Sequence, residues 1–334
     1  MKKMQFNKIN RILGIIVCLF SFTIFTMTVE PTASYWDCAE YISTSAKLQV
    51  GHPPGAPLFQ MLGAIFSTFA LEPDQIAFAV NMMSVSSSAL TILFLFWSIS
   101  HLVKQIVSKN QNISLTESFK IFGSSSLGAL TFTFTDSFWY NAVEAEVYAM
   151  ASLILSLLFW LGLKWTEDLD KPRGDKWLIL ISFVIGLSFG VHFMGLLAIP
   201  AVGLLYYFKK YNFNLKSFLL ANIISISILL FIFKLLLPTT LSIFGYVEVF
   251  FVNEIGLPFN YGTIFSAILL ILTIYYLLNK SYKKNKYALN TITLCITFIF
   301  IGFSSWLMIP IRSNANTVIN ENAPSDARSL SAYY

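Results

Sequence analysis

Charged residues are scarce in this 334-residue chain, where Asp, Glu, Lys and Arg together make up only 12% of the sequence. A typical soluble domain holds about a quarter. Hydrophobic residues make up 56%, and the mean hydropathy is +0.68. This composition excludes an ordinary soluble domain and indicates an integral membrane protein. We attribute the formal charge of +5 to loops beside the membrane and expect no nucleic-acid partner.

Cysteine and recognisable metal-ligand or nucleotide motifs are also scarce. Cys18 and Cys295 lie inside apolar runs and Cys38 stands alone outside them, which excludes a disulfide framework. The sequence has no metal-ligand spacing, glycine-rich phosphate loop or Ser-His-Asp order. We therefore expect no metal site and no cofactor, although the sequence leaves a divalent metal open. A sugar transferred outside the membrane would need a donor carried in the lipid.

Long apolar runs, in contrast, are abundant. A helical span needs about 20 mainly apolar residues. Nine segments qualify: 12–29, 77–103, 119–135, 147–165, 177–190, 193–208, 217–237, 262–279 and 288–309. Segment 56–71 is short and opens with Pro57, which predicts a re-entrant or interfacial helix. We predict an all-α, polytopic transmembrane helix bundle of about nine spans with a large first extracytoplasmic loop, 30–76.

The positive charges predict the orientation of these spans. All but four of the 22 Lys and Arg residues fall on one side; the exceptions are Lys47, Lys234, Arg312 and Arg328. By the positive-inside rule the N-terminus is cytoplasmic, and 30–76, 136–146, 238–261 and 310–334 face outward. We expect a transmembrane domain over 1–309, followed at 310–334 by the truncated start of an extracytoplasmic segment.

The first outward loop carries an unusual stretch, "SYWDCAEYISTSAKLQVGHPPGAPLFQ". Asp37 and Glu40 are three residues apart, so on a helix they share a face. Trp36 and Tyr41 stand beside them, and aromatics interleaved with acids suit a sugar, which stacks on rings and offers hydroxyls. An exposed carboxylate there could take a proton from a hydroxyl directly. A solvated loop with incidental acids is the alternative.

His52 begins a rigid turn, His52-Pro53-Pro54-Gly55, because each proline fixes its own φ and glycine permits a sharp exit. His52 could bind a phosphate or orient the acids, or the turn could simply lead into the next helix. His192, at the turn between two spans, is a candidate ligand-binding residue or a packing residue.

Two further acids, Glu144 and Glu146, lie at the outer start of a predicted helix. Carboxylates there complement the positive end of a helix, which explains at least one of them without function. Because positions i and i+2 of a helix face different directions, we expect at most one to face the first loop.

Two cations stand near the outer boundary. Arg312, directly outside the last span, suits a lipid phosphate or anchors the chain at the membrane surface. Lys234 either reaches outward to water or pairs with an acid.

Four stretches resemble a known family: "YWDCAEYISTSAKLQVGHPPGAPLF", "NAVEAEVYAMASL", "GLSFGVHFMGLLAIPA" and "IRSNANTVINENAP". They are similar to a bacterial family of multi-spanning proteins, common in Bacteroidetes and formerly of unknown function, which is related to protein O-mannosyltransferases of the GT-C superfamily. The resemblance runs from residue 35 to 324. Ala39, in "DCAE", stands where that family usually has glycine.

The resemblance implies a GT-C-like fold and an inverting glycosyltransferase of the bacterial inner membrane with a periplasmic active site. Its partners would be a polyprenyl-phosphate sugar and the hydroxyl groups of a protein acceptor. It implies that Asp37 is the catalytic base and that Glu40 orients the acceptor or Asp37. It places five further residues along the cavity or at the phosphate: His52, Glu144, Glu146, His192 and Arg312.

Two other functions remain open from the sequence. One is a transporter or flippase for a lipid-linked solute, which predicts charged residues at mid-membrane and broken helices. The other is a non-catalytic membrane subunit of an envelope assembly.

Overall fold

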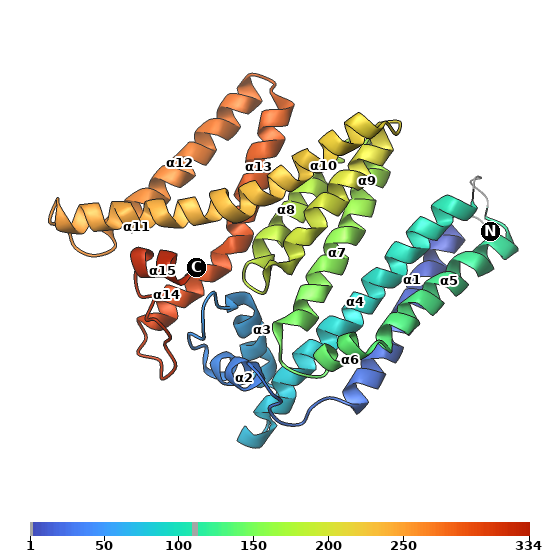
Figure 1. Cartoon of the computed structure of the whole chain (residues 1–334), viewed down its shortest axis with the longest axis horizontal. Helices are drawn as coiled ribbons and strands as arrows, with labels where there is room; N and C mark the ends of the chain where they lie inside the picture. Colours follow the sequence, from blue (N-terminus) through green and yellow to red (C-terminus); the bar gives the residue numbers. More distant parts are fainter. Residues whose placement is uncertain (1–2, 109–112) are drawn as a thin grey trace. The chain divides into compact units, whose positions relative to one another are not determined.

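A computed structural model describes residues 3–108 and 113–334 (Figure 1). It confirms the all-α prediction, with 78% of residues in helices and no strand in the described chain. Lys109, part of a predicted cytoplasmic loop, falls outside the described residues.

The helices belong to two compact units, Met1–Ala46 with Leu62–Lys164, and Lys47–Met61 with Trp165–Tyr334. The boundaries pass through α3 (Pro57–Ser67) and α7 (Val147–Asp168). The first unit also contains α1 (Lys3–Met27), α2 (Cys38–Lys47), α4 (Ile76–Val107), α5 (Leu115–Thr133) and α6 (Asp136–Ala142). The second contains α8 (Lys176–Ser188), α9 (Ala198–Lys210), α10 (Leu215–Leu230), α11 (Leu237–Asn253), α12 (Tyr261–Lys283), α13 (Tyr287–Phe303), α14 (Met308–Ser313) and α15 (Ala327–Tyr333).

In the first unit, α1, α4 and α5 pack side by side (Figure 1). Phe25, Phe96 and Ala129 are fully buried in their common core. The hydroxyls of Ser21 on α1 and Thr133 on α5 share a 2.9 Å hydrogen bond, which satisfies two polar groups in an apolar interior. This packing fixes the helix ends from which the first loop leaves and to which it returns.

Seven described helical segments are long and apolar enough to cross a membrane: Gln5–Met27, Pro73–Val107, Val147–Asp168, Phe193–Lys210, Leu215–Asn253, Tyr261–Lys283 and Tyr287–Ser313. The chain is therefore a multi-pass membrane protein. All nine predicted spans contain helix, but α5 and α8 lie outside the seven. α5 carries seven Ser and Thr residues, and the 13 residues of α8 extend only about 20 Å, short of the hydrocarbon core.

In the second unit, α8 and α13 approach closely through two glycines. A Cβ at Gly186 would lie 2.2 Å from the carbonyl oxygen of Ile299, and one at Gly302 would lie 2.3 Å from that of Phe183. Any side chain at either position would push the backbones apart. The pair is thus an example of the small-residue contacts that let membrane helices pack tightly.

The segment 215–253 forms one continuous helical rod in Figure 1. Within the segment 238–261, which we predicted to face outward, the structure has the helix α11 from Leu237 to Asn253. Pro238 lies in the first turn of α11, directly after a π-helical stretch, Phe231–Leu236. Proline has no backbone N–H and its ring crowds the preceding turn of a helix. The wider π-helical turn leaves room for the ring, so the helix continues through Pro238. Glu248 then accepts the backbone N–H of Thr263 at 2.7 Å and fixes the start of α12.

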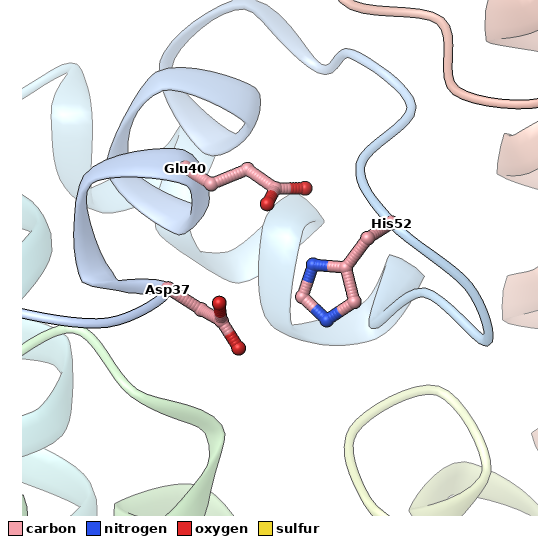
Figure 2. Close-up of side chains that lie close together, drawn as sticks. All are labelled: Asp37, Glu40 and His52. Atoms are coloured by element: carbon pink, nitrogen blue, oxygen red, sulfur yellow. The ribbon is translucent and has the colours of Figure 1, made fainter.

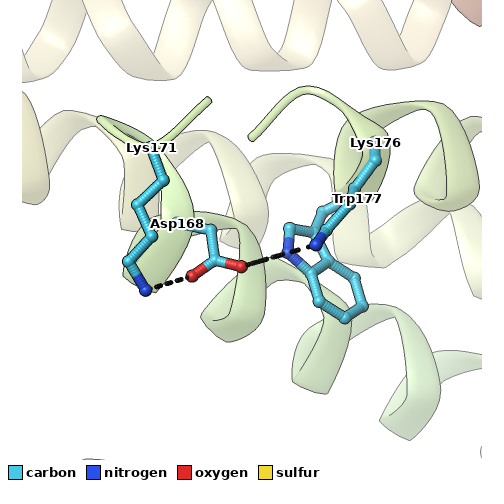
Figure 3. A network of polar contacts seen from close by, with 4 residues as sticks. All are labelled: Asp168, Lys171, Lys176 and Trp177. Carbon is cyan, nitrogen blue, oxygen red and sulfur yellow. Dashed lines mark hydrogen bonds and ion pairs between the residues drawn. The ribbon is translucent and has the colours of Figure 1, made fainter. Parts of the chain in front are cut away.

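The connector between α7 and α8 is ordered by one acid (Figure 3). Asp168 receives the Lys171 ammonium at 2.7 Å and the indole N–H of Trp177 at 2.9 Å. The Lys176 ammonium lies 3.9 Å from the same carboxylate and 5.0 Å from the centre of the Trp177 ring. Each partner is accounted for within the connector, as expected for a structural turn.

Candidate active site

The first loop is held to its unit by a buried amide. Asn81 on α4 is fully buried and donates to the carbonyl oxygens of Glu30 at 2.7 Å and Thr32 at 2.9 Å. The backbone N–H of Glu30 also donates to the carbonyl of Val143 at 3.0 Å. Sequence reasoning missed Asn81. The sequence feature that could have indicated its role is an amide side chain inside an apolar helix, where a polar group without a hydrogen-bond partner is costly.

Asp37 and Glu40 stand at the start of α2, and Figure 2 shows both carboxylates extending to the same side of it. The prediction that they share a face is therefore confirmed. The carbonyl of Asp37 accepts the N–H of Tyr41 at 2.9 Å, which begins the helix. The Asp37 side chain is exposed and that of Glu40 is half-buried. Trp36, just before them, is 89% exposed with a φ of 61°, so its indole is open to a ligand.

Glu146 is buried close to this pair, with 6% of its surface exposed. Its carboxylate accepts hydrogen bonds from the backbone N–H groups of Asp37 and Val147. Burial, followed by the charges of Asp37 and Glu144, raises the pKa of Glu146 to about 7. Its Oε1 atom is buried with no hydrogen-bond partner among the described residues. Glu146 is thus partly protonated near neutral pH, beside an exposed acid.

Glu144 also faces the first loop, because it accepts a short hydrogen bond from the Ser34 hydroxyl. The expectation that at most one of Glu144 and Glu146 does so is therefore wrong. Both lie in the bend before α7, which begins only at Val147, so helical directions do not apply to them. Burial raises the pKa of Glu144 above its ordinary value, and the nearby charge of Glu30 adds to the effect.

A pocket of about 450 Å³ opens beside Glu144, wholly within the first unit. It is lined by Glu30, Ala33, Ser34, Tyr35, Tyr140, Val143 and Glu144. The charge of Glu144 is the main cause of a raised pKa at the Tyr140 hydroxyl, so the two groups are close. Neither Glu30, Glu144 nor Glu146 has a Lys or Arg partner in the described part of the chain. This side of the molecule therefore carries uncompensated negative charge.

The second unit holds the loop that contains His52, which is also drawn in Figure 2. Arg312 binds the backbone just before this loop: its guanidinium donates to the carbonyl of Leu48 at 2.5 Å and to that of Lys47 at 3.1 Å. From the sequence we predicted that Arg312 binds a lipid phosphate or anchors the chain at the membrane surface. These backbone contacts were not predicted. A guanidinium has five N–H donors, so these bonds leave others for a phosphate.

The last residues of the sequence make further contacts with this loop. The buried Tyr333 hydroxyl donates to the carbonyl of Gly51 at 2.5 Å and lies 3.2 Å from that of His52. Gly55 has a φ of +72°, and a Cβ there would lie 2.9 Å from the Tyr333 hydroxyl. Val50 pairs in a parallel bridge with Asn320. The region expected to begin an outward domain thus folds back onto the His52 loop.

His192 begins the helical turn at Phe193–Leu197, and its Nδ1 accepts the N–H of Met194 at 3.1 Å. Burial lowers its pKa, so the ring is neutral at pH 7. This hydrogen bond gives His192 a capping role at the start of the turn. The ammonium of Lys234 lies 4.6 Å from the centre of the Phe233 ring.

The site residues thus divide into two groups. The first unit brings together Asp37, Glu40, Glu144 and Glu146 with Trp36 nearby in sequence, whereas His52, His192 and Arg312 belong to the second unit. The first group contains the exposed carboxylate of Asp37 and, close to it, the buried carboxylate of Glu146 with its raised pKa. Such a pair can accept a proton from a bound hydroxyl.

Comparison with known proteins supplies a family for this arrangement. A family model described as "Protein O-mannosyl-transferase TMEM260 N-terminal domain" matches residues 37–215, just over half of the chain. Protein O-mannosyl-transferase TMEM260 of Mus musculus is 27% identical over 169 residues, or 49% of this chain and 21% of the relative. Protein O-mannosyl-transferase tmem260 of Dictyostelium discoideum is 27% identical over 189 residues, or 53% of this chain and 21% of the relative. The chain matches about a fifth of the length of these relatives. No solved structure matches it significantly.

Proposed function

This chain belongs to the protein O-mannosyl-transferase TMEM260 N-terminal domain family, and from that membership we propose that it is a membrane glycosyltransferase that glycosylates protein hydroxyl groups. The observation that carries the proposal is the exposed carboxylate of Asp37, the first residue of the matched region. Asp37 directly precedes α2 in the first loop, and Glu40 extends to the same side (Figure 2).

The reaction we propose is a single displacement. Asp37 accepts the proton of a Ser or Thr hydroxyl on the acceptor while the hydroxyl oxygen attacks the anomeric carbon of the sugar. The bond from that carbon to the phosphate oxygen breaks, and its electron pair leaves with the polyprenyl phosphate. The configuration at the anomeric carbon inverts. Because the leaving group is already a phosphate anion, the displacement itself does not need a nucleotide.

The neighbouring acids support this role for Asp37. Glu40, half-buried one turn along α2, would accept a hydrogen bond from the acceptor and orient it. Glu146, with its pKa at about 7, is largely uncharged at slightly acidic pH and adds little repulsion against a second negative charge. Its acceptor bond from the Asp37 N–H fixes the backbone that carries the base.

The family resemblance suggests three residues for contacts to the donor phosphate: His52, His192 and Arg312. A phosphate carries negative charge, which suits the remaining donors of Arg312 and a ring nitrogen of His52 or His192. Trp36 offers an exposed ring for a sugar face. We place the enzyme in the bacterial inner membrane with the N-terminus in the cytoplasm and Asp37 on the periplasmic side, as the distribution of Lys and Arg predicts.

The test compares Asp37→Asn and Glu40→Gln in the full-length protein, with mass spectrometry of envelope glycoproteins as the measurement. We expect Asp37→Asn to lower glycan occupancy to background, because general-base catalysis contributes about 10²–10⁴-fold. Glu40→Gln should reduce occupancy less. Glu72→Gln is the matched control, since it removes one exposed acid of the same unit and should leave occupancy unchanged.

Normal occupancy in an Asp37→Asn protein that is present in the membrane at wild-type level would contradict the proposal. It would favour transport of a lipid-linked solute or a non-catalytic role in an envelope assembly. Cysteine labelling at Ser34 from outside the cell tests the orientation separately.

A further inference from the structure

The pocket beside Glu144 has an unusual chemistry for a hydroxyl-modifying enzyme. Two carboxylates, Glu30 and Glu144, line its 450 Å³ together with the rings of Tyr35 and Tyr140. Glu144 is only 5% exposed, and Ser34 satisfies one of its oxygens. The other oxygen has no hydrogen-bond partner among the described residues, although Glu144 lines the pocket. This oxygen is accessible from the pocket, so a bound group can donate a hydrogen bond to it.

The charge of the pocket restricts the ligand to a cation. Glu30 and Glu144 are close enough for the charge of Glu30 to act on Glu144, and no lysine or arginine of the described chain neutralises either. An anion would be repelled, and a neutral sugar would leave the two charges uncompensated. A guanidinium or ammonium relieves the repulsion, donates to the Glu144 oxygen that Ser34 does not occupy, and can lie against the exposed rings of Tyr35 and Tyr140.

The position of the pocket indicates where this cation comes from. Tyr35 and Ser34 line the pocket two and three residues before Asp37 on the same loop. A chain advances at most about 3.5 Å per residue, so a polypeptide with its hydroxyl at Asp37 has its flanking side chains within reach. We propose that this pocket binds an arginine or lysine side chain of the acceptor polypeptide, located within about three residues of the modified Ser or Thr. The identification of the acceptor rests on the proposed function.

The test is a binding measurement that requires no sugar transfer. The probes are two dye-labelled peptides that differ only in arginine or citrulline, two residues from a serine. The protein is the full chain in nanodiscs, followed by fluorescence anisotropy. We expect the arginine peptide to bind about tenfold more tightly than its citrulline counterpart, with a preference that weakens as salt rises.

Two variants locate the effect. Glu144→Gln keeps an oxygen for the Ser34 hydroxyl, and Glu30→Gln keeps one for Thr32, so each removes charge with little change of shape. Each should reduce the arginine preference severalfold, and the double variant should abolish it. Glu72→Gln, an exposed acid away from the pocket, should leave it unchanged.

Equal affinity of wild-type protein for the two peptides would overturn the inference, as would a preference that persists in a folded double variant. Failure of the proposed function is distinguishable. If Asp37→Asn leaves glycosylation intact while the arginine preference depends on Glu30 and Glu144, the pocket binds basic polypeptide but the enzymatic assignment is wrong.

Discussion

Acids in two regions of this molecule are treated in opposite ways. In the connector after α7, Asp168 contacts the ammonium of Lys171 (Figure 3). Asp170, two residues further on, contacts the ammonium of Lys210 on α9. These cations stand on the exposed surface, where such pairs contribute little to stability. In the bend before α7, beside the first loop, Glu144 and Glu146 are almost fully buried and have no cation in the described chain. The exposed acids of the connector thus have basic partners although water already screens their charge. The buried acids before α7 have none, although burial makes their ionisation costly.

This difference in charge compensation distinguishes a structural turn from a candidate functional site. A turn needs only partners that hold it in place: Lys171 lies three residues from Asp168, and Lys210 reaches Asp170 from α9. A buried acid without a counter-charge destabilises the fold unless it keeps a proton or receives a ligand. The first loop therefore has a cost that folding alone does not explain, and a substrate that brings a proton or a positive charge does explain it.

The largest expected effect on the fold comes from the amide that holds the first loop. Asn81→Ala leaves the carbonyls of Glu30 and Thr32 without their donor, so we expect the free energy of unfolding to fall by about 1–3 kcal/mol. Asn222→Ala is the matched control, because Asn222 bonds only to Phe218 of its own helix. Thermal unfolding in nanodiscs measures both. Equal losses in the two variants would show that Asn81 has no special role.

An intermediate effect concerns pH. The pKa of Glu146 is raised to about 7, so the folded state keeps a proton that the unfolded state releases near pH 4.5. The stabilising contribution is fully present below pH 4.5 and is lost as the pH rises through 7. We expect the unfolding temperature to fall between pH 5 and pH 8, and Glu146→Gln to reduce this fall.

Asp170 should behave in the opposite way, which sharpens the test. Lys210 lowers the pKa of Asp170, so its contribution is present above its unfolded pKa and lost as the pH falls through the folded value. Asp170→Asn should therefore leave the fall between pH 5 and pH 8 unchanged. A Glu146→Gln profile that matches the wild type would mean that Glu146 is ionised throughout this range.

The smallest effect is expected at the connector. Lys171→Gln removes an exposed ion pair with Asp168, so we expect only a small fall in the unfolding temperature. Thermal unfolding at low and high salt measures it, with the remaining difference shrinking at high salt. A larger loss that is insensitive to salt would place this turn among the elements that determine the fold.

Periodicity explains which features were predictable. Hydrophobic runs located the helices, and the spacing of Asp37 and Glu40 placed them on one face, since both inferences need only helical geometry. The same geometry failed at Glu144 and Glu146, because a bend replaces the expected helix. Asn81 and Arg312 act on carbonyl groups far away in sequence, and such contacts depend on tertiary packing that no local pattern contains.

Several of the contacts that hold the loop around His52 are made by its main chain. Arg312 and Tyr333 both grip carbonyl oxygens, which every amino acid possesses. Substitutions of side chains in this loop can therefore accumulate without releasing it, provided that the backbone keeps its path. Relatives could diversify what this loop presents to a ligand while its anchorage stays the same, much as an antibody loop varies on a constant framework.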